Sequence, residues 1–282
     1  MKYGFAVKII FVSSLLLTAF GCQSQTVSNS SNKTNSPANS NAANQSKTET
    51  KILEPQMVKF ESADKVVIIG TFYESPKAAS PAVLLLHQWG DSRKSYDEFA
   101  RKLQAKGFGV LAIDGRGFGE SVKTTSGETY KIERGDVTRG DETVKGMKAD
   151  VDNAFQFLTK QKNVDAARTG IVGASYGSSL AMIYGAENKQ VKAVALLSPG
   201  LNYFGGLPIE DAVKNYGDRN LLLVAADDDQ SSAETVKKLK ESVSNAKYET
   251  QIYPKGGHGT ALFASKVGLE DLLEKFLTKS LR

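Results

Sequence analysis

The sequence is poor in the residues that build metal centres and covalent cross-links. Its 282 residues include a single cysteine, Cys22, so no disulfide can form within the chain and no cysteine cluster can bind zinc. There are only two histidines, His87 and His258. Residues 1–50 hold four lysines and one glutamate, which leaves +2 of the total charge of +5 on residues 51–282. This weak charge, without a basic stripe interleaved with aromatic residues, argues against nucleic acid as a partner.

The first 22 residues have the layout of a secretory signal peptide. Two lysines precede an apolar stretch from Ile9 to Phe20, which is too short to span a bilayer comfortably. The end of this segment resembles a bacterial lipoprotein signal, although Ala19 and Phe20 stand where leucine and a small residue are usual. The resemblance implies a lipid anchor on Cys22 and a place in the cell envelope, outside the cytoplasmic membrane, on its periplasmic side or at the cell surface. An ordinary cleaved signal and an uncleaved anchor are the alternatives.

The remaining chain divides by composition into a linker and one domain. Residues 23–50 are dominated by Ser, Asn, Thr and Gln and cannot bury enough apolar surface to offset their ordering entropy, so we expect a disordered polar linker. Residues 51–282, about 230 in number, are enough for one large core and too few for two.

Eight short segments account for the strands expected in this domain. Six of them are apolar runs that suit strands buried on both faces of a sheet. The first two flank a polar turn at residues 63–65 and are expected to pair as an antiparallel N-terminal hairpin. The eight are Gln56 to Glu61, Val66 to Tyr73, Ala82 to Leu86, Gly109 to Ile113, Gly170 to Val172, Val191 to Leu197, Leu221 to Ala225 and Tyr248 to Ile252.

Segments with helical spacing alternate with these strands. They are Tyr96 to Lys106, Lys145 to Lys160, Ser178 to Glu187, Ala233 to Val243 and Lys266 to Leu277. The alternation predicts an α/β fold with a mostly parallel eight-stranded sheet and helices on both faces. Because ligands bind beyond the carboxyl ends of the strands in such sheets, the residues that directly follow each strand are the candidates for chemistry.

One candidate is the serine in Gly173-Ala174-Ser175-Tyr176-Gly177, which follows a strand and runs directly into a helix. A serine on such a strained turn projects its hydroxyl clear of the sheet, and glycines two places to either side let strand and helix pass without clashing. This context predicts that Ser175 is a nucleophile. A helix-capping serine in a glycine-lined turn is the alternative.

A serine hydroxyl is a poor nucleophile at neutral pH and needs a base within hydrogen-bond reach. His258 lies in a loop of small residues after the last strand and is predicted to be this base rather than a solvated loop histidine. A carboxylate must hold the base in the right tautomer, and Asp227, Asp228 and Asp229 follow the preceding strand. The residues themselves leave open which of the three does so.

The chain order Ser, Asp, His, each after a successive strand, resembles that of the α/β-hydrolase superfamily over the whole of residues 51–282. His87-Gln88-Trp89-Gly90 looks like the family's His-Gly-x-Gly oxyanion loop, with Gln88 in place of the usual glycine. Asp114 to Ser121 is similar to its Asp-x-Arg-Gly-x-Gly-x-Ser turn. Residues 226–229 correspond to its Gly-x-x-Asp, so the resemblance selects Asp229 as the acid that orients the histidine.

The resemblance also implies an oxyanion hole made by the backbone N–H groups of Trp89 and Tyr176, with that of Gln88 as the fallback. His87 is expected to hold its loop by hydrogen bonds rather than to catalyse. Since only residues 199–220 separate two of the strands, no large cap domain is expected, as in dienelactone-hydrolase-like proteins and small carboxylesterases.

Together these features predict a serine hydrolase that acts on small-molecule carboxylic esters or related acyl substrates. The reaction would use Ser175, Asp229 and His258 as a triad and pass through an acyl-enzyme intermediate. A cofactor-free haloperoxidase or acyltransferase with the same triad is one alternative, and a non-catalytic surface binding protein is another. No metal or organic cofactor is expected, because both histidines already have roles and no phosphate-cradling loop is present.

Overall fold

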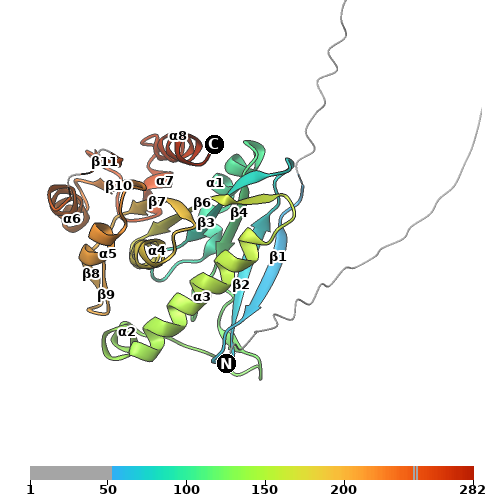
Figure 1. Cartoon of the computed structure of the whole chain (residues 1–282). Coiled ribbons are helices and arrows are strands. Elements are labelled where there is room, and N and C mark those ends of the chain that lie inside the picture. The colour runs from blue at the N-terminus through green and yellow to red at the C-terminus, as the bar shows by residue number, and fades with distance from the viewer. Residues whose placement is uncertain (1–52, 244, 246) are drawn as a thin grey trace, which may run out of the picture. The chain divides into compact units, whose positions relative to one another are not determined.

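The apolar runs of the sequence form the central strands of one mixed β-sheet (Figure 1). Its main strands are β1 (Gln56–Glu61), β2 (Val66–Tyr73), β3 (Ser80–Leu86), β4 (Gly109–Ile113), β6 (Val164–Ala174), β7 (Val191–Leu197), β10 (Asn220–Ala226) and β11 (Tyr248–Tyr253). They lie in the order β1-β2-β4-β3-β6-β7-β10-β11, and the short β5 (Lys123–Thr124) pairs with β2. Strands β1 and β2 pair antiparallel, as do β2 and β4, whereas all neighbours from β4 to β11 run parallel. The mostly parallel sheet and its N-terminal hairpin are therefore confirmed.

The structure, a computed structural model, describes residues 53–243, 245 and 247–282. These residues belong to one unit, Thr50–Arg282. The predicted signal peptide, polar linker and lipidation site at Cys22 lie outside the described residues.

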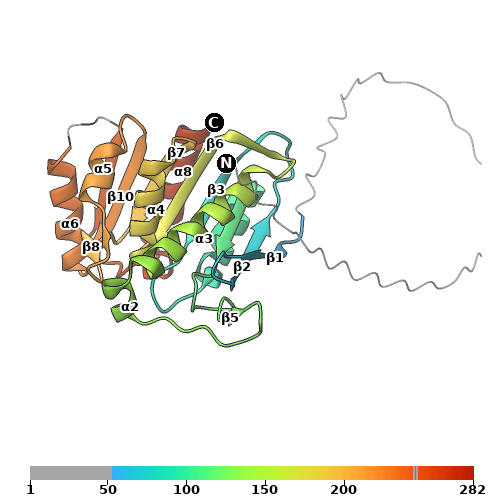
Figure 2. The same ribbon diagram turned by 60° about the horizontal axis from the view of Figure 1, so that its bottom comes forward.

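Helices cover both faces of the sheet, and alternate residues of each strand point to opposite faces. Leu84 and Leu86 of β3 point into a core that includes residues of α3, α4 and α6. Val83 and Leu85 point into a second core, built with α1 and α8. All four leucine and valine side chains are buried, which explains why the central strands are continuous apolar runs instead of alternating ones. Figure 2 shows α3 and α4 over one face of the sheet and α8 behind it.

The helices are α1 (Asp97–Ala105), α2 (Arg134–Arg139), α3 (Asp141–Thr159), α4 (Tyr176–Glu187), α5 (Glu210–Asn215), α6 (Gln230–Glu241), α7 (Ala261–Ala264) and α8 (Leu269–Leu281), with a 3-10 turn, η1, at Arg93–Tyr96. Each of the five predicted helices is present, with shifted ends. The short helices α2, α5 and α7 were not predicted from the sequence.

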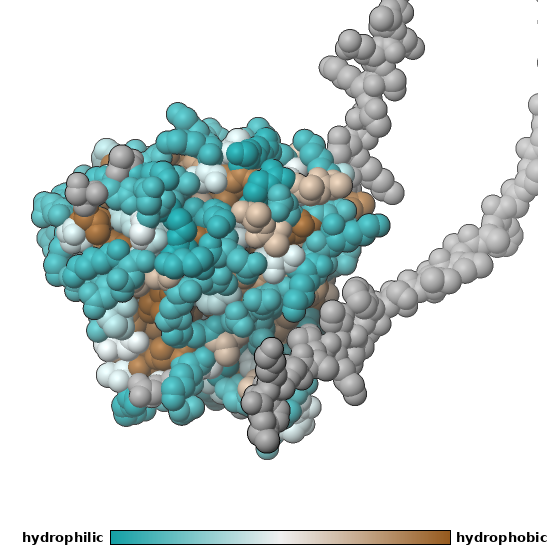
Figure 3. Space-filling model, in the orientation of Figure 1, coloured by the Kyte–Doolittle hydropathy of each residue, from teal (hydrophilic) through white to brown (hydrophobic). Residues whose placement is uncertain are grey.

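A small hairpin and α2 pack together in the two connections that the sequence left without structure. Strands β8 (Asn202–Tyr203) and β9 (Leu207–Pro208) pair across a three-residue loop, Phe204 to Gly206, in which Phe204 and Gly205 have positive φ angles of 54° and 76°. A Cβ on Gly206 would lie 2.2 Å from the carbonyl oxygen of Val137 in α2, so the hairpin and the helix are in close contact. This flap is small, and the described residues contain no large cap domain. On the mostly hydrophilic face in Figure 3, hydrophobic residues gather at the lower left, toward α2 and the hairpin.

Candidate active site

Ser175 lies on a sharp turn between β6 and α4. Its φ of 53° and ψ of −124° are strained for a residue with a side chain. A Cβ on Gly173 would lie 2.2 Å from the carbonyl oxygen of Gly177, and a Cβ on Gly177 would lie 2.5 Å from that of His87. Both flanking glycines are therefore required for the turn. The Ser175 side chain forms no hydrogen bond to the start of α4, which argues against the helix-capping alternative.

The hydroxyl of Ser175 instead faces the imidazole of His258. The distance from Ser175 Oγ to His258 Nε2 is 2.7 Å, and that from His258 Nδ1 to Asp229 Oδ2 is also 2.7 Å. Because a carboxylate oxygen only accepts, these partners assign the proton to Nδ1 and leave Nε2 free to accept from the serine hydroxyl. The structure thus brings the three predicted triad residues together in one hydrogen-bonded chain.

The three consecutive aspartates after β10 have different surroundings. Asp229 occupies the position before α6, yet its side chain bonds to His258 and not to the helix. The carboxylate of Asp228 accepts hydrogen bonds from the amides of Gly257 and Gly256 at 3.0 to 3.2 Å, and these bonds lower its pKa. Asp227 is exposed. Of the three, Asp229 is the one in contact with the imidazole.

Two further residues lie near His258: Ser198, whose contact the sequence did not predict, and Tyr203, which the sequence suggested only as an apolar wall of the site. Ser198, the residue after β7, accepts a hydrogen bond at its Oγ from the amide of Gly259 at 2.8 Å. Tyr203 donates its hydroxyl to the Ser198 carbonyl at 2.8 Å, and its ring meets the imidazole edge-on at 6.4 Å between ring centres. Burial raises the pKa of Tyr203, so its hydroxyl stays protonated at neutral pH. Ser198 can be recognised in the sequence as a polar residue directly after an apolar strand. Its hydrogen-bond partner cannot, because Gly259 lies in a loop whose shape the sequence does not specify.

The two predicted oxyanion residues lie side by side. The rings of Trp89 and Tyr176 pack edge-to-face with 5.4 Å between centres. No hydrogen bond among the described residues uses either amide N–H as donor. Tyr176 is also the first residue of α4, where the helix dipole favours negative charge. Neither amide therefore has an acceptor among the described residues.

His87 supports this loop as the sequence suggested. Its Nδ1 bonds to the carbonyl oxygen of Gln88 at 2.7 Å, and its Nε2 accepts from the amide of Gly115 at 2.8 Å. Burial lowers the pKa of His87, and only the neutral ring can make both bonds. His87 therefore links the loop after β3 to the turn after β4.

Aromatic side chains from three segments form one wall beside the candidate triad. The Trp89 ring lies 4.8 Å from that of Phe118 and 4.7 Å from that of Phe204 at the hairpin tip. Tyr203 lies 5.9 Å from Phe204, and the Arg134 guanidinium stacks over Phe204 at 5.3 Å. The wall gives the site an apolar side with a cation at its outer edge.

The turn from Asp114 to Ser121 has a structural role. Asp114 accepts from the amides of Arg93 and Glu120 at 2.7 and 2.8 Å and pairs with the Arg93 guanidinium. Arg116 forms a buried ion pair with Asp150 of α3 at 2.6 Å. These groups are fully engaged with one another, so the turn fastens β4 to its neighbours and contributes no free catalytic group.

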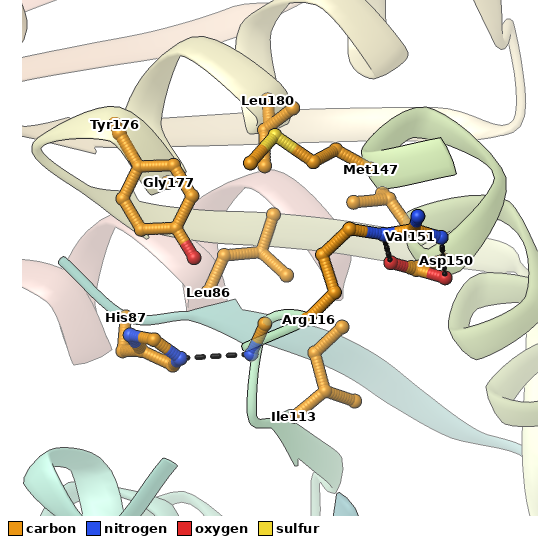
Figure 4. A pocket seen from close by; sticks show the side chains of 11 residues that line it. Leu86, His87, Ile113, Arg116, Met147, Asp150, Val151, Tyr176, Gly177 and Leu180 are labelled. Atoms are coloured by element: carbon orange, nitrogen blue, oxygen red, sulfur yellow. Dashed lines mark hydrogen bonds and ion pairs between the residues drawn. The ribbon is translucent and has the colours of Figure 1, made fainter. Parts of the chain in front are cut away.

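A small cavity of about 20 Å³ lies behind the serine turn, where Tyr176 directs its hydroxyl between Leu86 and His87 (Figure 4). A Cβ on Gly115 would lie 2.3 Å from this hydroxyl, so glycine is needed there. The cavity has room for about one water molecule and none for an ester. This cavity is therefore not a candidate substrate pocket.

Two features are absent from the part of the chain that the structure describes. Within residues 53–243, 245 and 247–282, no group of three or more His, Cys, Asp or Glu side chains is placed to hold a metal ion. In the same ranges, no helix has the length and apolar character needed to cross a bilayer.

The strand order and the serine turn define the class of protein: the chain has the α/β-hydrolase fold. A family model described as serine aminopeptidase, S33 matches residues 77–216, from the end of the loop before β3 to the end of α5. This match ends before β10, so it includes Ser175 but neither Asp229 nor His258. None of the curated proteins matches the sequence significantly.

Solved structures with the same fold include several esterases. Acetyl xylan esterase 1 from Thermoanaerobacterium sp. has 18% identity and a TM-score of 0.66, over 81% of this chain and 84% of that one. An esterase of Pyrococcus furiosus has 18% identity and a TM-score of 0.64, over 81% and 92%. Dienelactone hydrolase from Anabaena variabilis has 21% identity and a TM-score of 0.59, over 82% and 100%. At these identities the likeness concerns the fold alone.

Proposed function

We propose that the protein is a serine hydrolase of carboxylic esters or related acyl compounds. The observation that carries this proposal is the chain of two 2.7 Å contacts from Ser175 Oγ through His258 to Asp229. It is supported by the hydrolase family match and by the esterases among the structural neighbours.

The reaction begins with attack of Ser175 Oγ on the carbonyl carbon of the ester. His258 Nε2 takes the hydroxyl proton as the C–O bond forms, and Asp229 stabilises the resulting imidazolium. The carbonyl oxygen becomes an oxyanion that the amides of Trp89 and Tyr176 bind. When this intermediate collapses, His258 gives its proton to the leaving alkoxide, and an acyl-serine remains.

A water molecule then hydrolyses the acyl-serine by the same steps. His258 Nε2 takes a proton from the water as its oxygen attacks the acyl carbon. Collapse of the second oxyanion returns the proton to Ser175 Oγ and releases the carboxylic acid. One water is consumed per ester, and the protein ends unchanged.

The family description favours a second candidate substrate class, the amide of an aminoacyl group. The test compares p-nitrophenyl esters of increasing acyl length with aminoacyl p-nitroanilides. Because the hairpin flap is small, we expect kcat/KM to fall from short chains to those of about twelve carbons; a deep groove would instead gain about 0.8 kcal/mol for each buried methylene. Faster turnover of the anilides would favour the peptidase, and turnover of neither class would contradict the proposal.

We also propose that Cys22 carries a lipid that anchors the protein outside the cytoplasmic membrane. The proposal rests on the lysines, apolar stretch and cysteine of residues 1–22. Cys22→Ser should yield a soluble protein or an uncleaved precursor, as judged by membrane fractionation and intact mass. An unchanged mature mass and unchanged fractionation would rule lipidation out.

A further inference from the structure

Gln88 stands where the resembling family has a glycine in its oxyanion loop, and its side chain has a defined partner here. Gln88 Oε1 accepts a hydrogen bond from the amide of Thr260 at 2.8 Å. Thr260 is two residues beyond His258, and Gln88 directly precedes Trp89. The bond therefore joins the loop of the candidate base to the loop of a candidate oxyanion donor.

Other contacts hold the His258 loop to a different part of the sheet. Asp228 binds the amides at 256 and 257 from the end of β10, and Ser198 binds the amide at 259 from the end of β7. Neither contact reaches the loop after β3. Thr260 Oγ1 does reach it, by donating to Asp91 at 3.0 Å. Gln88 and Asp91 are thus the hydrogen-bonding side chains by which the oxyanion loop holds residues 256–260, as far as the described residues show.

The backbone at Gly259, beside this hydrogen bond, leaves space for a long side chain at position 88. Gly259 has a φ of +60°, and a Cβ on it would lie 1.9 Å from Gln88 Oε1. The glycine at 259 therefore makes room for the glutamine at 88. Glycine at 88, as in the family pattern, would leave the Thr260 amide without this acceptor.

We propose that Gln88 is a positioning residue that fixes His258 relative to the oxyanion amide of Trp89. The inference rests on the proposed function, in which both groups act on the same tetrahedral carbon. Misplacement of a reacting group by about 1 Å can cost about 100-fold in rate, so a tie between the two loops acts on the chemical step more than on ground-state binding.

The test compares Gln88→Met, which keeps the length and loses the acceptor, with Gln88→Glu, which keeps an acceptor oxygen. We expect Gln88→Met to lower kcat for a short-chain ester by about 10- to 100-fold with KM nearly unchanged. Gln88→Glu should recover most of that loss. Thr260→Val, which removes only the contact to Asp91, is the matched control and should have a smaller effect on kcat.

Hydrogen exchange of the Thr260 amide gives a second readout that needs no substrate. Exchange should be faster in Gln88→Met than in the wild-type protein and slow again in Gln88→Glu. Equal exchange in all three proteins, or a rise in KM with kcat unchanged, would overturn the inference. Because exchange can be measured even if the wild-type protein hydrolyses no ester, failure of the inference and failure of the proposed function are distinguishable.

Discussion

The two histidines of this chain follow strands of the same sheet, yet they have opposite surroundings. The side chain of His258 is 43% exposed, whereas His87 is 2% exposed as a whole residue. Both rings bond through Nδ1 to an oxygen, the Asp229 carboxylate for His258 and the Gln88 carbonyl for His87. Their Nε2 atoms both accept a hydrogen bond, one from Ser175 and the other from the amide of Gly115.

The two histidines differ in the group that donates the hydrogen bond to Nε2. A serine hydroxyl can give up its proton as its oxygen attacks a carbon, and the aspartate then stabilises the charged ring. An amide N–H keeps its proton, and burial disfavours a charge on His87. The same neutral tautomer is therefore poised for proton transfer in one place and for holding a loop in the other.

Removal of each histidine should separate these roles, with the largest effect at His258. His258→Ala should lower kcat for ester hydrolysis by about 10⁶-fold while leaving stability nearly unchanged, because base and nucleophile act as one unit. Kinetics of the folded variant and its thermal unfolding together check this. A His258→Ala protein with turnover within about tenfold of wild type would contradict the role of His258 as the base.

The carboxylates of Asp229 and Asp228 should differ in their effect on catalysis. Asp229→Asn should lower kcat by about 10⁴-fold, since an amide at Nδ1 favours the wrong tautomer. Asp228→Asn should cost far less, because Asp228 binds only the backbone of the loop. Steady-state kinetics of both variants decide between them. Equal losses would mean that the acid of the site is not Asp229.

His87 should appear in the pH dependence of stability. The ordinary histidine pKa is 6.5, and burial lowers that of His87 in the folded protein. As the pH falls below about 6.5, the unfolded chain binds a proton that the folded protein does not, so stability is lost by up to about 1.4 kcal/mol per pH unit until the folded pKa is reached.

The matched variant is His87→Gln, which offers Gly115 an acceptor but does not titrate. Urea unfolding at about pH 7 and about pH 5.5 should show a smaller loss of stability for His87→Gln than for the wild-type protein. Parallel losses would indicate that His87 is not held neutral by the fold.

The sequence predicted the central sheet well because its strands are buried on both faces. The bounds of β1, β2, β4 and β7 agree with the apolar and extended runs. Strand β6 begins at Val164, earlier than the predicted Gly170. The sequence did not predict its first half, because this part is only partly buried and carries polar residues. The hairpin and α2 were not predicted, since contacts such as that of Gly206 with Val137 join residues far apart in sequence.

The sequence predicted those site residues that can be identified from their type and their position after a strand. Ser175, His258 and the aspartates follow successive strands, and the fold brings them to one edge of the sheet. The supporting contacts of Ser198 and Gln88 were not predictable, because each joins a side chain to a backbone amide of another loop. Such pairing depends on loop shape, which no local pattern specifies.

The central claim is that His258 makes Ser175 a nucleophile, and reaction with a fluorophosphonate tests it most directly. The phosphorus reagent needs an activated serine but no knowledge of the natural substrate. Intact mass and peptide mapping should show one adduct on Ser175 in the wild-type protein, none in Ser175→Ala and a greatly slowed reaction in His258→Ala. Absence of an adduct on folded wild-type protein, or equal labelling of His258→Ala, would contradict the account.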